Sequence, residues 1–243
     1  MSHRRIGVLG GMGPAATADF MHKLVLLTPA SCDQEHLPVM IANLPHIHDR
    51  SRAILGQGED PWPQLEAGIE LMNRIGVGVL VIPCNSSHHW FDRMSACSEA
   101  PVLHIASASV SAIAATPASK VAIFATRGVI SSGFYQQALA RRDIGFWVPG
   151  PTQEQEHIDS CIRLVKAGRL EEGGRSLELA LRGAQSAGAD TVILGCTELP
   201  LASQYVPAPQ LTLIDSSLEL ARAAVAYGLE RRWNTAPWIA PPD

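Results

Sequence analysis

Two stretches decide the fold: Val-Leu-Val-Ile-Pro-Cys at 79–84 and Thr-Val-Ile-Leu-Gly-Cys at 191–196. In each, an apolar run rich in β-branched residues ends at a cysteine. Runs this apolar need cover on both faces, which is typical of a parallel sheet flanked by helices. The two stretches therefore predict an α/β protein with two thiols, Cys84 and Cys196, at the carboxyl ends of strands.

The rest of the chain alternates between short apolar runs and amphipathic stretches. It begins with a strand at 5–9 and a helix over 15–27. We predict further strands at 38–43, 77–83, 102–105, 121–125, 146–148, 191–195 and 211–214. Helical patterns separate most of these strands, as in βα units.

The predicted strands fall into two similar sets of about four. Ile6 opens the first set and Cys84 follows 78 residues later, while Val121 opens the second and Cys196 follows 75 residues later. We therefore expect two pseudo-symmetric lobes, each a roughly four-stranded parallel sheet flanked by helices. The expected divisions are an N-terminal lobe over 1–116, a C-terminal lobe over 117–231 whose helix 217–231 returns to the first lobe, and a tail over 232–243.

The matching positions of the two cysteines predict where a ligand binds. Open α/β sheets bind ligands beyond the carboxyl ends of their strands. Two lobes related by an approximate two-fold axis bring those ends face to face. We expect a cleft with Cys84 on one wall and Cys196 on the other, a coincidence that independent burial of two cysteines does not explain.

The composition favours a globular enzyme. Hydrophobic residues make up 47% of the chain and charged residues 17%, with a net charge of -4. No cluster of Lys and Arg exceeds a dipeptide, so we expect no nucleic-acid partner. The apolar segment at 6–9 is too short for a signal peptide and no run is long enough to span a bilayer, which predicts a cytoplasmic protein without a membrane partner.

The five cysteines give no sign of a disulfide framework or a structural zinc site. They are odd in number, widely spaced and contain no Cys-x-x-Cys pair. Cys32, Cys97 and Cys161 are interpreted as small hydrophobic residues. A zinc site through Cys84 and His88 lacks further ligands, so no metal is expected.

A glycine-rich turn, Gly-x-x-Gly-Gly-Met-Gly-Pro at 7–14, joins the first strand to the first helix. It is similar to a dinucleotide-binding loop, but its spacing is not Gly-x-Gly-x-x-Gly and no ribose-binding acid ends the second strand. Backbone N–H groups at the helix start could bind a carboxylate instead. A tight turn in which the glycines serve packing explains the pattern equally well, and no cofactor is expected.

Polar residues follow each of the two cysteines. Asn85 and Ser86 either hydrogen-bond a ligand's amino and carboxylate groups or only cap the next helix. His88 either supports the site or lies on the helix surface and pairs with Asp92. In Gly-Cys-Thr-Glu at 195–198, Glu198 either caps a helix or acts as the proton partner of the thiol.

These segments together resemble the aspartate/glutamate racemase family. The family's Gly-Gly-Met-Gly-Pro opening stands at 10–14, its Cys-Asn-Thr-Ala-His motif at 84–88 and its Gly-Cys-Thr-Glu motif at 195–198. Supporting stretches lie at 49–50, 103–106, 125–128, 132–135 and 214–216, so the likeness runs from about residue 5 to 230.

The resemblance implies a two-lobed, commonly dimeric enzyme that uses paired cysteines and neither pyridoxal phosphate nor a metal. It implies catalysis by Cys84 and Cys196, support from His88 and Glu198, and substrate binding by Met12, Arg50, Asn85, Ser86, Thr126, Lys166 and Thr197. Arg50 matches the arginine associated with the substrate's side-chain carboxylate, although Arg50 and Lys166 are also compatible with exposed surface positions. Ser86 and Ser87 replace the usual Thr-Ala, and Val129 replaces a frequent threonine.

We therefore expect a cofactor-independent racemase of aspartate, glutamate or both, in which one cysteine removes the α-proton and the other protonates the opposite face. Racemisation needs a proton carrier on each face, and both cysteines are present. One alternative is a single-thiol isomerase or decarboxylase of a related dicarboxylate. Another is a non-catalytic amino-acid-binding sensor, which would bind the amino acid without exchanging its α-proton.

Overall fold

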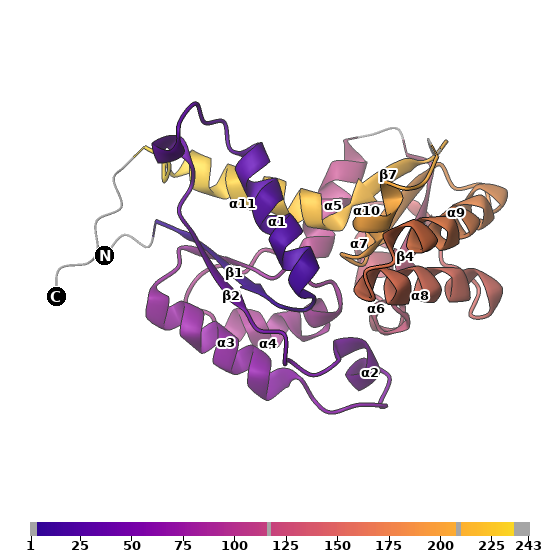
Figure 1. Ribbon diagram of the computed structural model, residues 1–243, viewed down its shortest axis with the longest axis horizontal. Helices are drawn as coiled ribbons and strands as arrows, with labels where there is room; N and C mark the ends of the chain where they lie inside the picture. Colours follow the sequence, from indigo (N-terminus) through magenta and orange to yellow (C-terminus); the bar gives the residue numbers. More distant parts are fainter. Residues whose placement is uncertain (1–3, 116–117, 208–209, 236–243) are drawn as a thin grey trace.

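The computed structural model describes residues 4–115, 118–207 and 210–235, and it contains two parallel β-sheets flanked by helices (Figure 1). The strands are β1 (Ile6–Gly10), β2 (Val39–Asn43), β3 (Val79–Val81), β4 (Lys120–Ala125), β5 (Gly145–Trp147), β6 (Thr191–Gly195) and β7 (Thr212–Asp215). The first sheet has the order β2-β1-β3 and the second the order β5-β4-β6-β7. All of these pairs are parallel, as the apolar runs predict.

Helices separate the strands along the chain. The α-helices are α1 (Pro14–Leu27), α2 (Arg50–Ile54), α3 (Trp62–Ile75), α4 (Phe91–Cys97), α5 (Ile105–Ala114), α6 (Arg127–Ser132), α7 (Phe134–Ala140), α8 (Gln153–Lys166), α9 (Leu170–Ser186), α10 (Leu199–Ser203) and α11 (Ser216–Glu230). Two 3₁₀ turns add η1 (Asp33–Glu35) and η2 (Ser86–Trp90).

The predicted strand at 102–105 is wrong. Val102 makes only an isolated parallel bridge to Leu80, and α5 begins at Ile105. His104 ends the extended segment because its side chain accepts a hydrogen bond from the Ala106 N–H, which caps the helix. The first sheet therefore has three strands where about four were expected, whereas the second has four.

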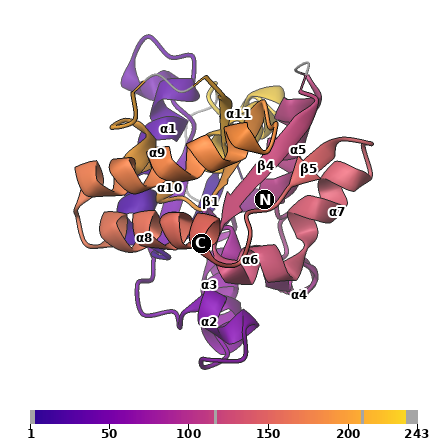
Figure 2. The ribbon, with the colours of Figure 1, turned by 90° about the vertical axis from the view of Figure 1, so that its right-hand side faces the viewer.

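Each sheet is covered on both faces. Helices α3 and α4 pack on one face of the first sheet, and α1 and α11 on the other (Figure 1). Helices α8 and α9, in front in Figure 2, cover one face of the second sheet, and α5 and α7 the other. This double cover is why β1, β3, β4 and β6 are apolar along almost their whole length.

Two helices pack on the sheet of the opposite half of the chain. Helix α11 follows β7 of the second sheet, but its Leu220 and Ala224 pack with Ile6 and Val8 of β1. Helix α5 follows the first sheet and packs on β4 of the second. The two halves thus share their cores.

Two predictions about the chain's organisation fall partly outside the described residues. The division at 116/117 lies in a segment that the structure does not describe, and it stays a prediction. Of the predicted tail, the described part ends at residue 235, and Trp233 is buried against the cluster that contains α11. Over the described ranges, we find no helix with the length and apolar character needed to cross a bilayer.

Candidate active site

Cys84 and Cys196 lie at the carboxyl ends of equivalent strands and line one cavity. Cys196 directly follows β6, and Cys84 follows β3 after a two-residue link. Their relative exposures are 4% and 7%, so both thiols are largely shielded from bulk water. The cavity between the two halves has a volume of about 540 Å³, within the usual range for small-molecule sites.

The cavity collects residues from both halves of the chain. Its lining consists of Met12, Asp49, Arg50, Ser51, Arg52, Leu55, Cys84, Asn85, Ser86, Thr126, Arg127, Asp159, Ile162, Arg163, Lys166, Cys196, Thr197 and Glu198. All site residues expected from the sequence are among them except His88. Five of the lining side chains are basic and three are acidic, so the cavity has an excess of positive charge although the whole chain is negative.

Cys196 has a carboxylate as its immediate partner. Its Sγ donates to Glu198 Oε2 at 3.0 Å, and the Thr197 hydroxyl donates to the same oxygen at 3.4 Å. Burial raises the pKa of the Cys196 thiol well above its usual value, and the negative charge of Glu198 raises it further. Glu198 stands at the start of α10 but makes no side-chain cap there, so its carboxylate serves the thiol rather than the helix.

The surroundings of Cys84 are different. Its carbonyl accepts hydrogen bonds from Ser87 Oγ at 2.7 Å and from His88 Nδ1 at 3.0 Å. His88 is buried, which rules out the surface position expected as one alternative, and burial with nearby His104 lowers its pKa to about 3. The neutral ring of His88 therefore holds the backbone of the thiol's residue and does not line the cavity.

Asn85 and Ser86 face groups from the second half of the chain and do not cap η2. The Asn85 amide hydrogen-bonds Tyr135 and Ser216. Ser86 Oγ lies 3.2 Å from Thr126 Oγ1, which also caps α6 by accepting from the Val129 N–H. These contacts join the loop after β3 to the ends of β4 and β6.

The glycine-rich turn is explained by close packing. A Cβ on Gly10 would lie 2.4 Å from Thr17, and one on Gly11 would lie 2.3 Å from the backbone of Leu44. Gly11 also has a φ of +94°, which favours glycine. Its N–H donates to Thr17 Oγ1 at 2.8 Å, so this donor is used within the protein. Of the turn, Met12 lines the cavity.

Arg50 and Lys166 bring two cations to the cavity. The guanidinium of Arg50 donates to the carbonyl oxygens of Ile47, His48 and Met12, which fixes its position, while its Nε is buried without a partner. No hydrogen bond or ion pair within the described part of the chain engages the Lys166 ammonium. Burial alone would lower the pKa of Lys166, but the nearby acidic groups, Glu198 above all, outweigh it and raise the pKa, so the ammonium stays charged.

One face of α8 forms a wall of the cavity, of which the sequence predicted only Lys166. Asp159, Ile162, Arg163 and Lys166 line it at helical spacings of three and four. Extending the i, i+3, i+4 pattern back from Lys166 could have found them.

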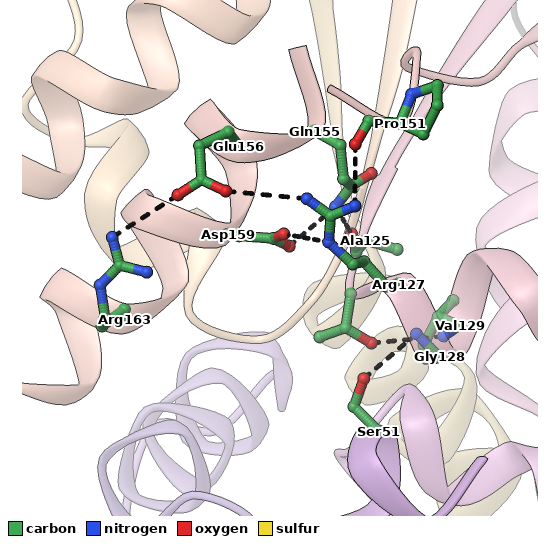
Figure 3. Close-up of polar contacts among 11 residues, drawn as sticks. Ser51, Ala125, Arg127, Gly128, Val129, Pro151, Gln155, Glu156, Asp159 and Arg163 are labelled. Carbon is green, nitrogen blue, oxygen red and sulfur yellow. Dashed lines mark hydrogen bonds and ion pairs between the residues drawn. The ribbon is translucent and has the colours of Figure 1, made fainter. Parts of the chain in front are cut away.

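This wall is fixed to the end of β4 through Arg127 (Figure 3). Arg127 Nε lies 2.6 Å from Asp159 Oδ2, and its Nη1 donates to the Pro151 carbonyl at 2.8 Å. Gln155 donates both to the Ala125 carbonyl and to Asp159, each at 2.9 Å. The guanidinium of Arg127 is therefore engaged in contacts within the protein, so its charge is not free to pair with a ligand.

Helix α2 closes another side of the cavity by touching α6. The Gly128 N–H donates to Ser51 Oγ at 3.1 Å (Figure 3). A Cβ on Gly128 would lie 2.7 Å from that oxygen and 2.9 Å from the Ser51 Cα. Only glycine allows this approach, which holds α2, with Arg50 and Arg52, against the second half of the chain.

The remaining cysteines take no part in the cavity. Cys161 is buried in the core and burial raises its pKa to about 12, Cys97 is half-buried, and Cys32 is exposed. Within residues 4–115, 118–207 and 210–235, no group of three or more His, Cys, Asp or Glu side chains is placed to hold a metal ion.

Comparison with known proteins places this chain in a family. Residues 9–224 match the family model described as Asp/Glu/Hydantoin racemase. The broad specificity amino-acid racemase RacX of Bacillus subtilis is 27% identical over 225 residues, which cover 91% of this chain and 96% of RacX. The glutamate racemase of Mycobacterium ulcerans is 32% identical over 190 residues, covering 73% of this chain and 65% of that enzyme.

Solved structures agree with the sequence comparison. The aspartate racemase of Picrophilus torridus superposes with a TM-score of 0.83 at 26% identity, over 95% of this chain and 99% of that one. The glutamate racemase of Francisella tularensis, in complex with D-glutamate, shares the fold with a TM-score of 0.68 at 18% identity, over 96% of this chain and 84% of that one. From the match over most of its length, the chain belongs to the Asp/Glu/hydantoin racemase family of isomerases.

Proposed function

We propose that the protein is a cofactor-independent racemase of a small acidic amino acid, aspartate, glutamate or both, with Cys84 and Cys196 as the two acid–base groups. One observation carries this proposal: two shielded thiols at matching strand ends, one from each half, line the same cavity. A planar carbanion formed between them can receive a proton on either face, which is the requirement of a racemase.

In the proposed reaction, the thiolate of one cysteine removes the α-proton and the C–H electron pair stays on the α-carbon, delocalised into the carboxylate. The opposite S–H then gives its proton to the other face, so the stereocentre inverts and the two sulfurs exchange protonation states. Donors around the cavity stabilise the carbanion-like state. The candidates are the side chains of Asn85, Ser86, Thr126 and Thr197.

Glu198 makes the two thiols unequal. The raised pKa of Cys196 makes it a thiol at rest, ready to act as the acid. To act as the base in the opposite direction, Cys196 must lose its proton, and the carboxylate at 3.0 Å is the acceptor in place. We therefore assign Glu198 as the proton partner of Cys196 and His88 as the residue that orders the backbone of Cys84.

The charge of the cavity supports an acidic substrate. Lys166 is a charged ammonium with no ion-pair partner among the described residues, and a second carboxylate on the substrate would supply that partner. The fixed guanidinium of Arg50 adds a second positive charge, and its buried Nε–H has no partner in the described part of the chain. Named relatives include glutamate and aspartate racemases, but also a broad specificity enzyme, so the substrate has to be measured.

The test is proton NMR of L-aspartate, L-glutamate and their amides L-asparagine and L-glutamine in deuterated buffer without added cofactor, followed by chiral analysis. We expect loss of the α-proton signal and appearance of the D-enantiomer with the acids, and at least tenfold slower exchange with the amides. In the Lys166→Met variant this preference should fall, whereas Arg182→Met, on the exposed face of α9, should leave it unchanged.

The other results have distinct meanings. Equal turnover of acids and amides would contradict the acidic substrate but not the racemase. No exchange with any amino acid would contradict the racemase, and turnover of a maleate or malonate derivative would then indicate a single-thiol isomerase or decarboxylase. Saturable binding without exchange would indicate a sensor.

A cytoplasmic location and a homodimer remain part of the proposal. Light scattering of the purified protein tests the second: a mass near twice 26.0 kDa is expected, and a mass of one chain would contradict it.

A further inference from the structure

The side chain of Asn85, next to Cys84, is held by two groups from the other half of the chain. The phenol of Tyr135, on α7, donates to Asn85 Oδ1 at 2.6 Å. Asn85 Nδ2 donates to the hydroxyl of Ser216, at the start of α11, at 3.0 Å. Tyr135 and Ser216 are fully buried and Asn85 is nearly so, so water cannot replace either partner.

The hydrogen bonds allow only one orientation of the Asn85 amide. The Ser216 hydroxyl donates its single proton to the Leu194 carbonyl at 2.7 Å, because a carbonyl oxygen can only accept. Its oxygen must therefore accept from Asn85, which places the amide nitrogen on that side. The Tyr135 proton then points to the amide oxygen. A flipped amide would instead set its oxygen against the Ser216 oxygen, two acceptors with no proton between them.

This orientation decides which hydrogen-bonding groups of the Asn85 amide face the cavity. Asn85 lines the cavity, and after these two bonds its amide keeps one N–H and one lone pair. The phenol stays a donor throughout the neutral range, because burial raises the pKa of Tyr135 more than the nearby hydroxyls of Ser109 and Ser216 lower it. A ligand therefore meets a fixed N–H rather than a rotating amide.

We propose that Tyr135 and Ser216 are positioning residues of the racemase, which act through Asn85 by fixing the direction of its amide N–H toward the substrate. The proposal rests on the proposed function, since it assigns Asn85 a contact with the amino acid. Neither Tyr135 nor Ser216 lines the cavity, so neither touches the substrate itself.

A double-mutant cycle on kcat/KM tests this inference. The variants are Tyr135→Phe, Asn85→Ala and their combination, with Tyr205→Phe, on a half-exposed tyrosine, as the matched control. We expect Tyr135→Phe to lower kcat/KM by roughly tenfold, and by less than twofold when Asn85 is already alanine. A merely structural role would lower kcat/KM by the same factor in both backgrounds, and that result would overturn the proposal, as would full activity of Tyr135→Phe.

A second measurement works even if the protein does not racemise any amino acid tested. The chain has four asparagines, so ¹⁵N-asparagine labelling gives few side-chain amide signals, and Asn85→Ala identifies the one of interest. We expect slow solvent exchange of the Asn85 amide proton that is bonded to Ser216 in the wild type, and at least tenfold faster exchange of it in Tyr135→Phe and Ser216→Ala. Fast exchange in the wild type would overturn the positioning role, whereas an inactive wild type with slow exchange would contradict only the proposed function.

Discussion

Glu198 is the residue that distinguishes the two catalytic candidates, since no equivalent carboxylate hydrogen-bonds Cys84 among the described residues. Glu198→Gln keeps the shape but removes the proton acceptor, so we expect kcat/KM to fall by about 10²-fold or more. The fall in kcat/KM must be equal for the two enantiomers. They have equal free energies, so the ratio of their kcat/KM values is fixed and no variant can change it. The difference between the two directions should appear in the primary isotope effect with α-deuterated substrate.

In that variant, the isotope effect should rise for the enantiomer whose proton Cys196 removes. It should fall for the other enantiomer, because reprotonation by Cys196 then limits the rate instead of C–H cleavage by Cys84. Glu178→Gln, at a partly exposed position of α9 outside the cavity, is the control and should behave as the wild type. Equal isotope effects for both enantiomers, or an unchanged kcat/KM, would refute the assignment of Glu198.

His88 and His104 should make the fold sensitive to acid. Their pKa values are lowered, by burial above all, to about 3 and about 4, below the usual 6.5. Below pH 6.5 the unfolded chain therefore binds protons that the folded one does not, and stability is lost as the pH falls from 6.5 toward these values. At pH 5 each contributes a loss of about 2 kcal/mol.

Urea unfolding between pH 7 and pH 4.5 measures this loss. His88→Gln retains a donor for the Cys84 carbonyl and should give a shallower fall of the unfolding free energy with decreasing pH. His46→Gln, at an exposed position, should keep the wild-type slope. The same slope in all three proteins would show that His88 takes up its proton in the folded state.

At the scale of single residues, the sequence predicted which side chains line the cavity better than it predicted the hydrogen bonds and ion pairs that these side chains make. The two strand-end cysteines and their neighbours fall together because the parallel strands of each sheet end at one edge, and both edges border the same cavity. Asp159 and Tyr135 went unnoticed as functional residues, because each acts from a helix distant in sequence. The choice between capping and catalytic roles for Asn85 and Glu198 needed coordinates, since both readings use the same residue types.

Among the secondary-structure elements, the contact between α2 and α6 is sensitive to a single methyl group and bears on the site. Gly128→Ala would place a Cβ against Ser51, so α2 must move away and carry Arg50 with it. We expect kcat/KM to fall by roughly 10- to 100-fold, with a loss of stability of only about 1–3 kcal/mol.

Gly183→Ala, within α9, is the matched control for this substitution. Its Cβ meets only Glu154 at an ordinary 3.5 Å, so the variant should keep full activity and gain slightly in stability. Wild-type kinetics for Gly128→Ala would show that the position of α2 does not affect the site.

Each of the strands β1 to β7 coincides closely with a predicted strand, at the edge of a sheet as well as at its centre, and the error is the extra strand predicted at 102–105. The run at 191–195 coincides with β6, because a strand covered on both faces must be apolar throughout. Leu103 and its neighbours have the same local character, but they form a single bridge at Val102 before the His104 cap starts α5. Local composition does not reveal which apolar segment finds a partner strand.

For the whole molecule, we expect one cooperative unfolding unit, because α5 and α11 each pack on the sheet of the opposite half of the chain. Leu220→Ala in α11 leaves a void beside β1 and should cost about 2–5 kcal/mol. Because α11 also links β7 to the first sheet, amide exchange in mild denaturant should accelerate equally in β1 and β4. Leu177→Ala in α9 is the control that perturbs the second sheet directly. Acceleration confined to β1 in Leu220→Ala would show that the halves unfold separately.

The central claim, that two thiols carry protons on opposite faces of the α-carbon, is tested most directly by chiral analysis and α-proton NMR in deuterated buffer with Cys84→Ser, Cys196→Ser and the wild type. The account predicts that the wild type forms the D-enantiomer of aspartate or glutamate carrying deuterium at the α-carbon. It predicts that each single variant, although folded, loses inversion by at least 10²-fold. Wild-type rates of inversion in either variant would contradict the claim.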